Sequence, residues 1–169
     1  MQLQESQREN LAGEWLIFRA GSQEYGIRIL QVQELRGYEP QLVTRVAFAP
    51  PAVLGLMNLR GQIIPVVDLR LKIGADDNPT INAQTVIMIL TLEGRMIGTV
   101  VDGVSDVLNL TADMIREPPK AQDIGSESRL CGLVEHDNRL IQLLDVAGLL
   151  GDSASQETHE MLVAQQNAS

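Results

Sequence analysis

Few side chains of this sequence have the type and spacing that chemistry requires. His136 stands between two acids and could bind a metal or transfer a proton, but one histidine with no nucleophile or further ligands is typical of an exposed turn. The segment Asp76–Asn78 resembles a calcium loop, yet the central glycine and closing glutamate of an EF-hand are missing. We therefore expect a solvated turn at each place and no metal site.

The sequence also lacks the usual marks of catalysis. Cys131 is the one cysteine, so it can form no internal disulfide, and within an apolar run it is typical of a small buried side chain. No glycine-rich phosphate loop follows a strand-like run, and no serine stands in a nucleophile-elbow context. The sequence therefore predicts no catalytic residue, no cofactor and no enzyme.

Arg60 is the side chain best suited to binding. It lies in the segment 55–70, GLMNLRGQIIPVVDLR, between two apolar runs and beside Gly61, which reaches positive φ without a Cβ clash. This pattern predicts a β-hairpin with Arg60 at its tip, where the guanidinium offers forked donors to a partner or is simply a solvated turn charge. Pro65 removes one backbone donor and predicts that the second strand is an edge strand or carries a bulge.

Composition limits the kind of protein that can carry this hairpin. The 169 residues are 44% hydrophobic but only 3% aromatic, and short Val, Ile and Leu runs alternate with turn residues, which favours small β-barrels. A formal charge of -9 with scattered basic residues disfavours nucleic acid and anionic membranes. No apolar run approaches the ~20 residues of a membrane span, and the N-terminus is polar, so we expect a cytoplasmic protein.

Several elements can be placed along the chain. We expect a flexible tail over residues 1–13, a hairpin over 15–30, and a helical turn leading into an extended segment over 29–35. Turn residues over 72–84 predict a boundary between two lobes of a domain that spans 14–150. Asp145 is a good N-cap for a short last helix ending near residue 150, and 151–169 is expected to be a tail or a marginal helix.

The two halves of the chain repeat one pattern. Gly26 aligns with Gly98, and without a gap the next matches pair Ile29 with Val101, Val32 with Val104, Glu34 with Asp106 and Leu35 with Val107. Gly55 aligns with Gly132, which pairs Arg60 with Asp137, Gly61 with Asn138 and Asp68 with Asp145. Two copies are too few for a solenoid and indicate a pseudo-symmetric pair of small lobes.

Three segments also carry a family resemblance. YGIRILQVQELRGY, VLGLMNLRGQIIPVVDLR and IGTVVDGVSDVLNLTADMI occur in the order found in the CheW family of bacterial chemotaxis coupling proteins, which the chain resembles over about 15–150. Phe48 and Leu54 depart from the family pattern, where polar or basic residues are common. The resemblance implies a mostly β fold of two pseudo-symmetric, intertwined five-stranded SH3-like barrels with short helices.

The resemblance further implies a non-catalytic adaptor of receptor arrays. In the family, a groove between the barrels receives the cytoplasmic helical tip of a chemoreceptor, and the regulatory domain of the histidine kinase CheA binds a second surface whose residues we do not assign. Carried over to this sequence, the receptor side comprises Val32, Glu34, Gly55, Arg60, Gly98, Val104 and Val107. The protein would associate with membrane-anchored receptors without inserting into the membrane.

Two other functions are compatible with the same sequence. A regulatory domain could bind a small molecule or metal in the cleft between the barrels, although the valine-rich lining offers few polar groups. The coupling fold could also serve an array with an output other than swimming.

Overall fold

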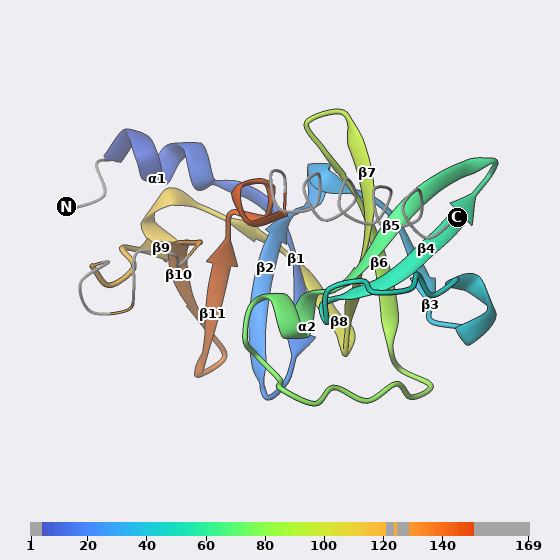
Figure 1. Cartoon of the computed structure of the whole chain (residues 1–169). Helices are drawn as coiled ribbons and strands as arrows, with labels where there is room; N and C mark the ends of the chain where they lie inside the picture. Colours follow the sequence, from blue (N-terminus) through green and yellow to red (C-terminus); the bar gives the residue numbers. More distant parts are fainter. Residues whose placement is uncertain (1–4, 121–123, 125–128, 151–169) are drawn as a thin grey trace.

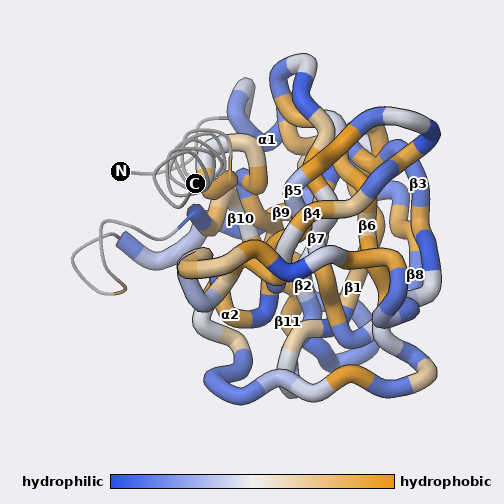
Figure 2. The backbone as a smooth tube through the Cα atoms, turned by 45° about the vertical axis from the view of Figure 1, so that its right-hand side comes forward, coloured by the Kyte–Doolittle hydropathy of each residue, from blue (hydrophilic) through white to orange (hydrophobic). Residues whose placement is uncertain are grey.

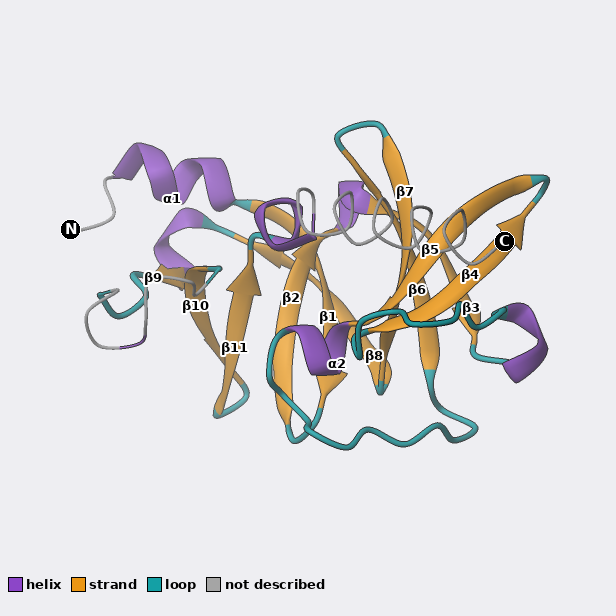
Figure 3. Ribbon diagram, in the orientation of Figure 1, coloured by secondary structure: helices purple, strands orange, loops and turns teal. Residues whose placement is uncertain are grey.

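The structure, a computed structural model, describes residues 5–120, 124 and 129–150, which form two β-sheets with short helices (Figure 1, Figure 3). The six-stranded sheet has the order β8 (Gly103–Leu110), β1 (Gly13–Ala20), β2 (Gln23–Arg28), β11 (Arg139–Leu144), β10 (Leu130–His136), β9 (Ile115–Arg116). The five-stranded sheet has the order β3 (Val32–Gly37), β6 (Val86–Leu92), β7 (Arg95–Val101), β5 (Gln62–Asp68), β4 (Val53–Leu59). The mostly β fold expected from the sequence is confirmed.

Each half of the chain contributes to both sheets. The first half places β1 and β2 in the six-stranded sheet and β3, β4 and β5 in the five-stranded sheet. The second half adds β6 and β7 to the five-stranded sheet and β8, β9, β10 and β11 to the six-stranded sheet. The connection over 72–84 therefore separates two halves of the sequence and not two sheets. The chain crosses between sheets once in each half, through η1 (Ile29–Gln31) and at the β7–β8 corner.

The strand registers reproduce the internal repeat. Gly26 of β2 lies opposite Leu143 in a parallel ladder, and the matching glycine, Gly98 of β7, lies opposite Val66 in another. The register shifts also match, because β3 and β8 are each irregular after their first valine and β4 and β10 are each irregular before a glycine. The repeated unit is therefore a backbone arrangement as well as a sequence pattern.

Buried apolar side chains form three clusters. The six-stranded sheet encloses Trp15, Ile17, Leu110, Ile115, Val134, Ile141 and Leu143. The five-stranded sheet encloses Met57, Leu59, Ile64, Val66, Ile87, Ile89 and Val100. The third and largest cluster, here called the intersheet core, takes its buried strand residues from both sheets, including Leu16, Phe18, Tyr25, Ile27, Met88, Leu90 and Val101.

Strands at the junction are buried on both faces. In β1, Trp15 and Ile17 belong to the core of their own sheet, whereas Leu16 and Phe18 belong to the intersheet core. This explains why the sequence runs there are continuously apolar instead of alternating, and why hydrophobic colour follows successive residues of the central strands in Figure 2. The repeat therefore buries its apolar residues by packing one sheet on the other.

Several local expectations are confirmed. η1 followed by β3 is the helical turn and extended segment, and both central hairpins turn through two residues with positive φ. A helix starts at residue 146 after Asp145, whose Oδ1 accepts the Gly148 N–H at 3.1 Å. Further short helices are η2 (Pro40–Leu42), α2 (Leu69–Lys72) and η3 (Ala112–Met114), and no helix in the described part of the chain is long and apolar enough to cross a membrane.

Two expectations differ from the structure. Within residues 1–13, for which a flexible tail was predicted, Glu5–Leu11 form helix α1, and the Leu11 carbonyl that ends it accepts the Trp15 indole N–H at 2.8 Å. The strand β5, expected to be an edge strand or to carry a bulge at Pro65, lies between β4 and β7, and the register shift in its ladder with β4 leaves Leu54 of β4 as the extra residue. Its parallel ladder with β7 starts only at Val66, so Pro65 pairs on one side alone and its missing N–H costs no ladder bond. The expectations for 151–169 lie outside the described residues.

Candidate partner-binding site

Arg60 stands at the tip of the β4–β5 hairpin. Arg60 and Gly61 have φ of 50° and 88°, and the Gly61 N–H donates to Asn58 Oδ1 at 2.8 Å, which holds the turn. The side chain is 71% exposed, and Arg60 Nη2 donates to Glu34 Oε2 at 2.9 Å. The guanidinium is therefore oriented by one carboxylate while most of its surface faces solvent.

Glu34 reaches Arg60 because of a bulge in β3. The register moves from Val32 opposite Leu90 to Glu34 opposite Ile89, so Gln33 is the extra residue. Ile89 belongs to the core of the five-stranded sheet, and Glu34 therefore points to the side from which the β4–β5 tip approaches. Arg36 Nε lies 3.7 Å from the other Glu34 oxygen, so two arginines share this carboxylate.

The three valines expected at the site differ in burial. Val32 and Val104 are partly buried against the intersheet core, one from each sheet. Val107 is 44% exposed, and its N–H donates to Asp106 Oδ1 at 2.7 Å. Both edge strands thus border the same core, with Val107 as the accessible apolar side chain of the three.

The two glycines expected at the site are buried and present no surface to a partner. Gly55 has a φ of 149°, and a Cβ there would lie 2.0 Å from the Thr44 carbonyl oxygen. A Cβ on Gly98 would meet Ile87 and Val66 at 3.3 Å. Both positions need glycine for close packing, so a direct contact with a receptor has no support in their position.

The second hairpin tip has the same backbone with opposite charge. Asp137 and Asn138 have φ of 51° and 63°, close to the values at Arg60 and Gly61. Glu135 forms an exposed ion pair with Arg116 at 2.9 Å, and His136 Nε2 lies 3.4 Å from Asp137 Oδ2. Within the described ranges, no group of three or more potential metal-ligating side chains comes together.

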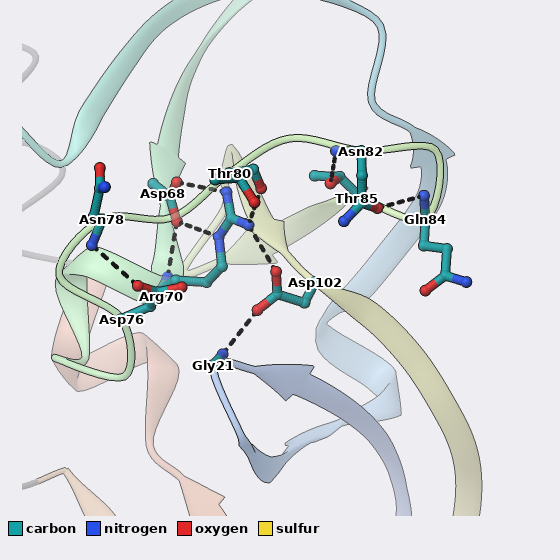
Figure 4. Close-up of polar contacts among 10 residues, drawn as sticks. All are labelled: Gly21, Asp68, Arg70, Asp76, Asn78, Thr80, Asn82, Gln84, Thr85 and Asp102. Carbon is teal, nitrogen blue, oxygen red and sulfur yellow. Dashed lines mark hydrogen bonds and ion pairs between the residues drawn. The ribbon is translucent and has the colours of Figure 1, made fainter.

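The structure also reveals a buried ionic cluster that the sequence did not predict (Figure 4). Arg70, 1% exposed, donates from Nε and Nη2 to the two oxygens of Asp68 at 3.0 and 2.9 Å. Its Nη1 donates to Asp102 Oδ1 at 2.8 Å and to the Thr80 carbonyl at 2.7 Å. Asp102 Oδ2 in turn accepts the Gly21 N–H at 2.8 Å. The cluster joins the β1–β2 turn, α2, the 74–85 connection and the β7–β8 corner.

Burial and charge act in opposite directions on Arg70. Desolvation lowers the pKa of the guanidinium, but hydrogen bonds to Asp68 and Asp102 and their negative charge outweigh it and raise that pKa. Asp68 and Arg70 stand two residues apart at the end of an apolar run. This spacing is the one signal in the sequence that could have suggested their ion pair. Nothing nearby in the sequence indicates Asp102 as the third member.

Cys131 shows no sign of reactivity. Burial raises the pKa of its thiol to about 11, the charge of Asp145 adds to this rise, and its Sγ lies 3.3 Å from the Leu143 carbonyl oxygen. A thiol with such a pKa is protonated and a poor nucleophile near neutral pH. The side chain was expected to be buried, but it is only partly buried and packs against the core of the six-stranded sheet.

Known proteins share this sequence and fold. The family model of the CheW-like domain matches residues 14–154. The chain is 44% identical over 142 residues to the Chemotaxis protein CheW of Klebsiella aerogenes, covering 84% of each, and 32% identical over 144 residues to the Probable chemotaxis protein CheW of Rhizobium etli, covering 85% and 90%. The crystal structure of the scaffolding protein TtCheW from Thermoanaerobacter tengcongensis matches with a TM-score of 0.71 and 26% identity, over 82% of this chain and 88% of that one. Sequence, repeat and fold together place this chain in the CheW-like family.

Proposed function

We propose that this protein is a non-catalytic adaptor that couples chemoreceptors to the histidine kinase CheA in chemotaxis signalling. Its relatives are named chemotaxis proteins, and a solved structure of the same fold is described as that of a scaffolding protein. The described residues support this role through two hydrogen-bonded β-sheets with charged residues at two matching hairpin tips. The protein would act in the cytoplasm, beside membrane-anchored receptors.

The receptor tip is proposed to bind where the five-stranded sheet presents Arg60. The observation that carries this proposal is the Arg60–Glu34 pair, in which one carboxylate orients a guanidinium that remains 71% exposed. A guanidinium held in this way can form charge-assisted hydrogen bonds to a partner with less loss of side-chain freedom. Val32, on the face of β3 opposite to Glu34, and Val104 and Val107 of β8 are proposed to supply the apolar contact of a docked helix, and Val107 is the accessible one at 44% exposure.

In this proposal, Gly55 and Gly98 shape the site by allowing close packing and do not contact the receptor. Gly55 lets Thr44 approach β4, where the two residues Thr44 and Leu56 exchange backbone hydrogen bonds of 2.7 and 2.8 Å. Gly98 lets β7 pack beside Val66. Substitution at either position would disturb the shape of the site without removing a contact. CheA is proposed to bind elsewhere, on a surface that we do not assign to residues.

Receptor binding by Arg60 variants tests the proposal. Arg60→Ala should weaken binding to a soluble chemoreceptor cytoplasmic fragment by about 1–3 kcal/mol, because charge-assisted bonds are lost, while Arg60→Lys should restore only part. The melting temperature should not change, since the side chain buries little of the core. Affinity can be measured by titration calorimetry with the purified full chain.

Asp137→Ala is the matched control. Asp137 has the same turn geometry but carries a carboxylate in place of the guanidinium, so its removal should change receptor affinity by less than ~0.5 kcal/mol. Equal losses at both tips, with unchanged melting temperatures, would show that the receptor site does not depend on Arg60. Absence of binding to both the receptor fragment and CheA by the unmodified chain would refute the adaptor function.

A further inference from the structure

Helix α1 precedes the part of the chain that the family model matches, which begins at residue 14. Its seven residues, Glu5–Leu11, are fewer than the ~12 that an isolated helix needs to be stable in water. Among residues 6–11, Arg8 and Leu11 are partly buried and the other four are exposed. The stability of α1 therefore depends on contacts that a small part of its surface makes with the six-stranded sheet.

Trp15 and Arg28 hold the C-terminal end of α1, and we call them the clamp. They are register partners in the β1–β2 ladder, and the Arg28 guanidinium carbon lies 5.1 Å from the centroid of the Trp15 ring. The Trp15 indole N–H donates to the Leu11 carbonyl at 2.8 Å, and Arg28 Nη2 donates to the Asn10 carbonyl. Both carbonyls belong to the last turn of α1, where the helix itself supplies no donors and the partial negative charge attracts a cation.

The Leu11 side chain supplies the apolar contact of α1. It packs against the core of the six-stranded sheet, and a Cβ added to Gly132 of β10 would lie 3.5 Å from Leu11 Cδ1 and 3.0 Å from Ile115 Cγ2. The helix also lies against η3, and Figure 1 shows it running above β9 and β10. Leu11 therefore covers the core where β9 and β10 meet, in space that a side chain at position 132 would restrict.

Gly13 connects α1 to β1. Its φ is 131°, a value that residues other than glycine rarely adopt, and no atom beyond its chain neighbours lies within 4 Å of the place of a Cβ. The Ala12 N–H still donates to the carbonyls of Arg8 and Glu9, at 3.1 and 3.2 Å, so the helical hydrogen bonds end directly before the glycine. The backbone at Gly13 can therefore absorb a rotation of the helix, as hinge residues do.

We propose that α1 is a hinged strap, which the clamp and Leu11 hold closed and which opens at Gly13 while both sheets stay folded. Opening breaks the clamp contacts and removes Leu11 from the core, whereas unfolding of the sheets disrupts their ladders and three buried clusters. Opening should therefore need a much smaller free energy than global unfolding. The open state exposes the Trp15 indole N–H and the apolar surface beside Gly132. The alternative is that α1 separates only when the sheets unfold.

Hydrogen exchange measured by NMR on the full-length chain tests the proposal. The sequence has one tryptophan, so its indole N–H signal is unambiguous. We call this group and the Ala12 amide the strap reporters, because both bond to carbonyls of α1. After correction for intrinsic exchange rates, the strap reporters should exchange at least about tenfold faster than the most protected amides of β1 and β2. Equal protection would contradict the strap.

Ile89→Val is the deciding variant. Ile89 is buried in the core of the five-stranded sheet, and loss of one methyl group lowers the free energy of global unfolding. Sheet amides that exchange through global unfolding should then exchange about fivefold faster. The strap reporters should stay within about twofold, because the substituted core is intact when α1 is open. Acceleration of the strap reporters by the same factor as the sheet amides would overturn the proposal.

Variants of the contact residues test what holds the strap closed. Arg28→Met keeps the aliphatic stem but removes the charge over Trp15 and the bond to α1, so the indole N–H should exchange about five- to tenfold faster. Leu11→Ala should accelerate it by about tenfold. Arg19→Met is the control within the same pair of strands, since the exposed Arg19 lies beside Gly103, and it should change exchange by less than about twofold.

A change of less than about twofold in Arg28→Met would show that the clamp does not hold α1, and the same result in Leu11→Ala would remove the apolar contact from the proposal. Arg28→Gln takes the place of the methionine variant if the latter does not fold.

Discussion

The two copies of the repeated unit have one backbone but different charges. In the first copy, the acid that ends β5 and the arginine of α2 meet an acid at the β7–β8 crossover. The cluster joins Asp68 and Arg70 of the first copy to Asp102 of the second. At the matching positions, the second copy has Asp145 and Ala147, and the first copy has Leu30. Asp145 is exposed and Leu30 is 94% exposed, so one crossover is fixed by buried charges and the other is not.

The residue kept in both copies shows what the repeat requires. Asp68 Oδ1 accepts the Arg70 N–H and Asp145 Oδ1 accepts the Gly148 N–H, so each aspartate caps the short helix that follows its hairpin. The cap is a local need of the backbone and occurs twice. The ionic cluster needs side chains from several segments and occurs once. The comparison teaches that the repeat preserves backbone geometry, while side chains that contact other segments or solvent can differ.

Removing the capping aspartate should give the largest difference in stability loss between the two copies. Asp68→Ala leaves Arg70 buried with one carboxylate fewer and should lower the free energy of unfolding by about 3–5 kcal/mol. Asp145→Ala loses only a helix cap and should cost about 0.5–2 kcal/mol. Urea denaturation of both variants measures these losses. Equal losses would mean that the cap alone matters and that the ionic cluster adds no stability.

Adding a methyl group at matched glycines should give the next largest difference. Gly55→Ala places a Cβ 2.0 Å from the Thr44 carbonyl oxygen at a φ of 149° and should cost about 2–4 kcal/mol, because backbone has to move. At the equivalent Gly132, the nearest atom is a side-chain methyl of Ile115 at 3.0 Å, and the cost should be about 1 kcal/mol. Thermal unfolding of the two variants compares them. A larger loss at Gly132 would contradict the close approach of Thr44 to β4.

The smallest expected effect concerns the residues at the matching bulges, Leu54 and Cys131. Burial raises the pKa of the Cys131 thiol from 9.0 to about 11, so the folded protein holds this proton more tightly than the unfolded chain. The stability that this proton contributes is fully present below the pKa of the unfolded chain and is lost as the pH rises toward the pKa of the folded protein. The loss amounts to about 1 kcal/mol by pH 10. The difference in stability between the unmodified chain and Cys131→Ala should therefore shrink by that amount between neutral pH and about pH 10.

Urea denaturation at the two pH values measures this change. Leu54→Ala is the control, because leucine does not titrate and its contribution should show no such dependence. A constant difference between the unmodified chain and Cys131→Ala at both pH values would mean that the thiol titrates alike in the folded and unfolded states.

Local sequence was enough to determine the turns, the caps and the repeat. Two-residue turns at Arg60 and Asp137, the η1 turn before Val32 and the Asp145 cap depend on neighbouring residues, and all appear as expected. The mostly β composition and the two aligned copies also indicated paired β units. The site residues came from the family resemblance, and of these the structure brings Glu34 and Arg60 into contact.

Only the tertiary structure decided which segments meet. Pro65 indicated an edge strand or a bulge, yet β5 pairs with β7 from the other half of the chain, and the bulge lies in β4. Asp102 completes the Arg70 cluster, and Thr44 makes Gly55 indispensable, but neither partner is near in sequence. Such contacts depend on how two intertwined sheets pack, and the free energy of that packing is distributed over residues far apart in the chain.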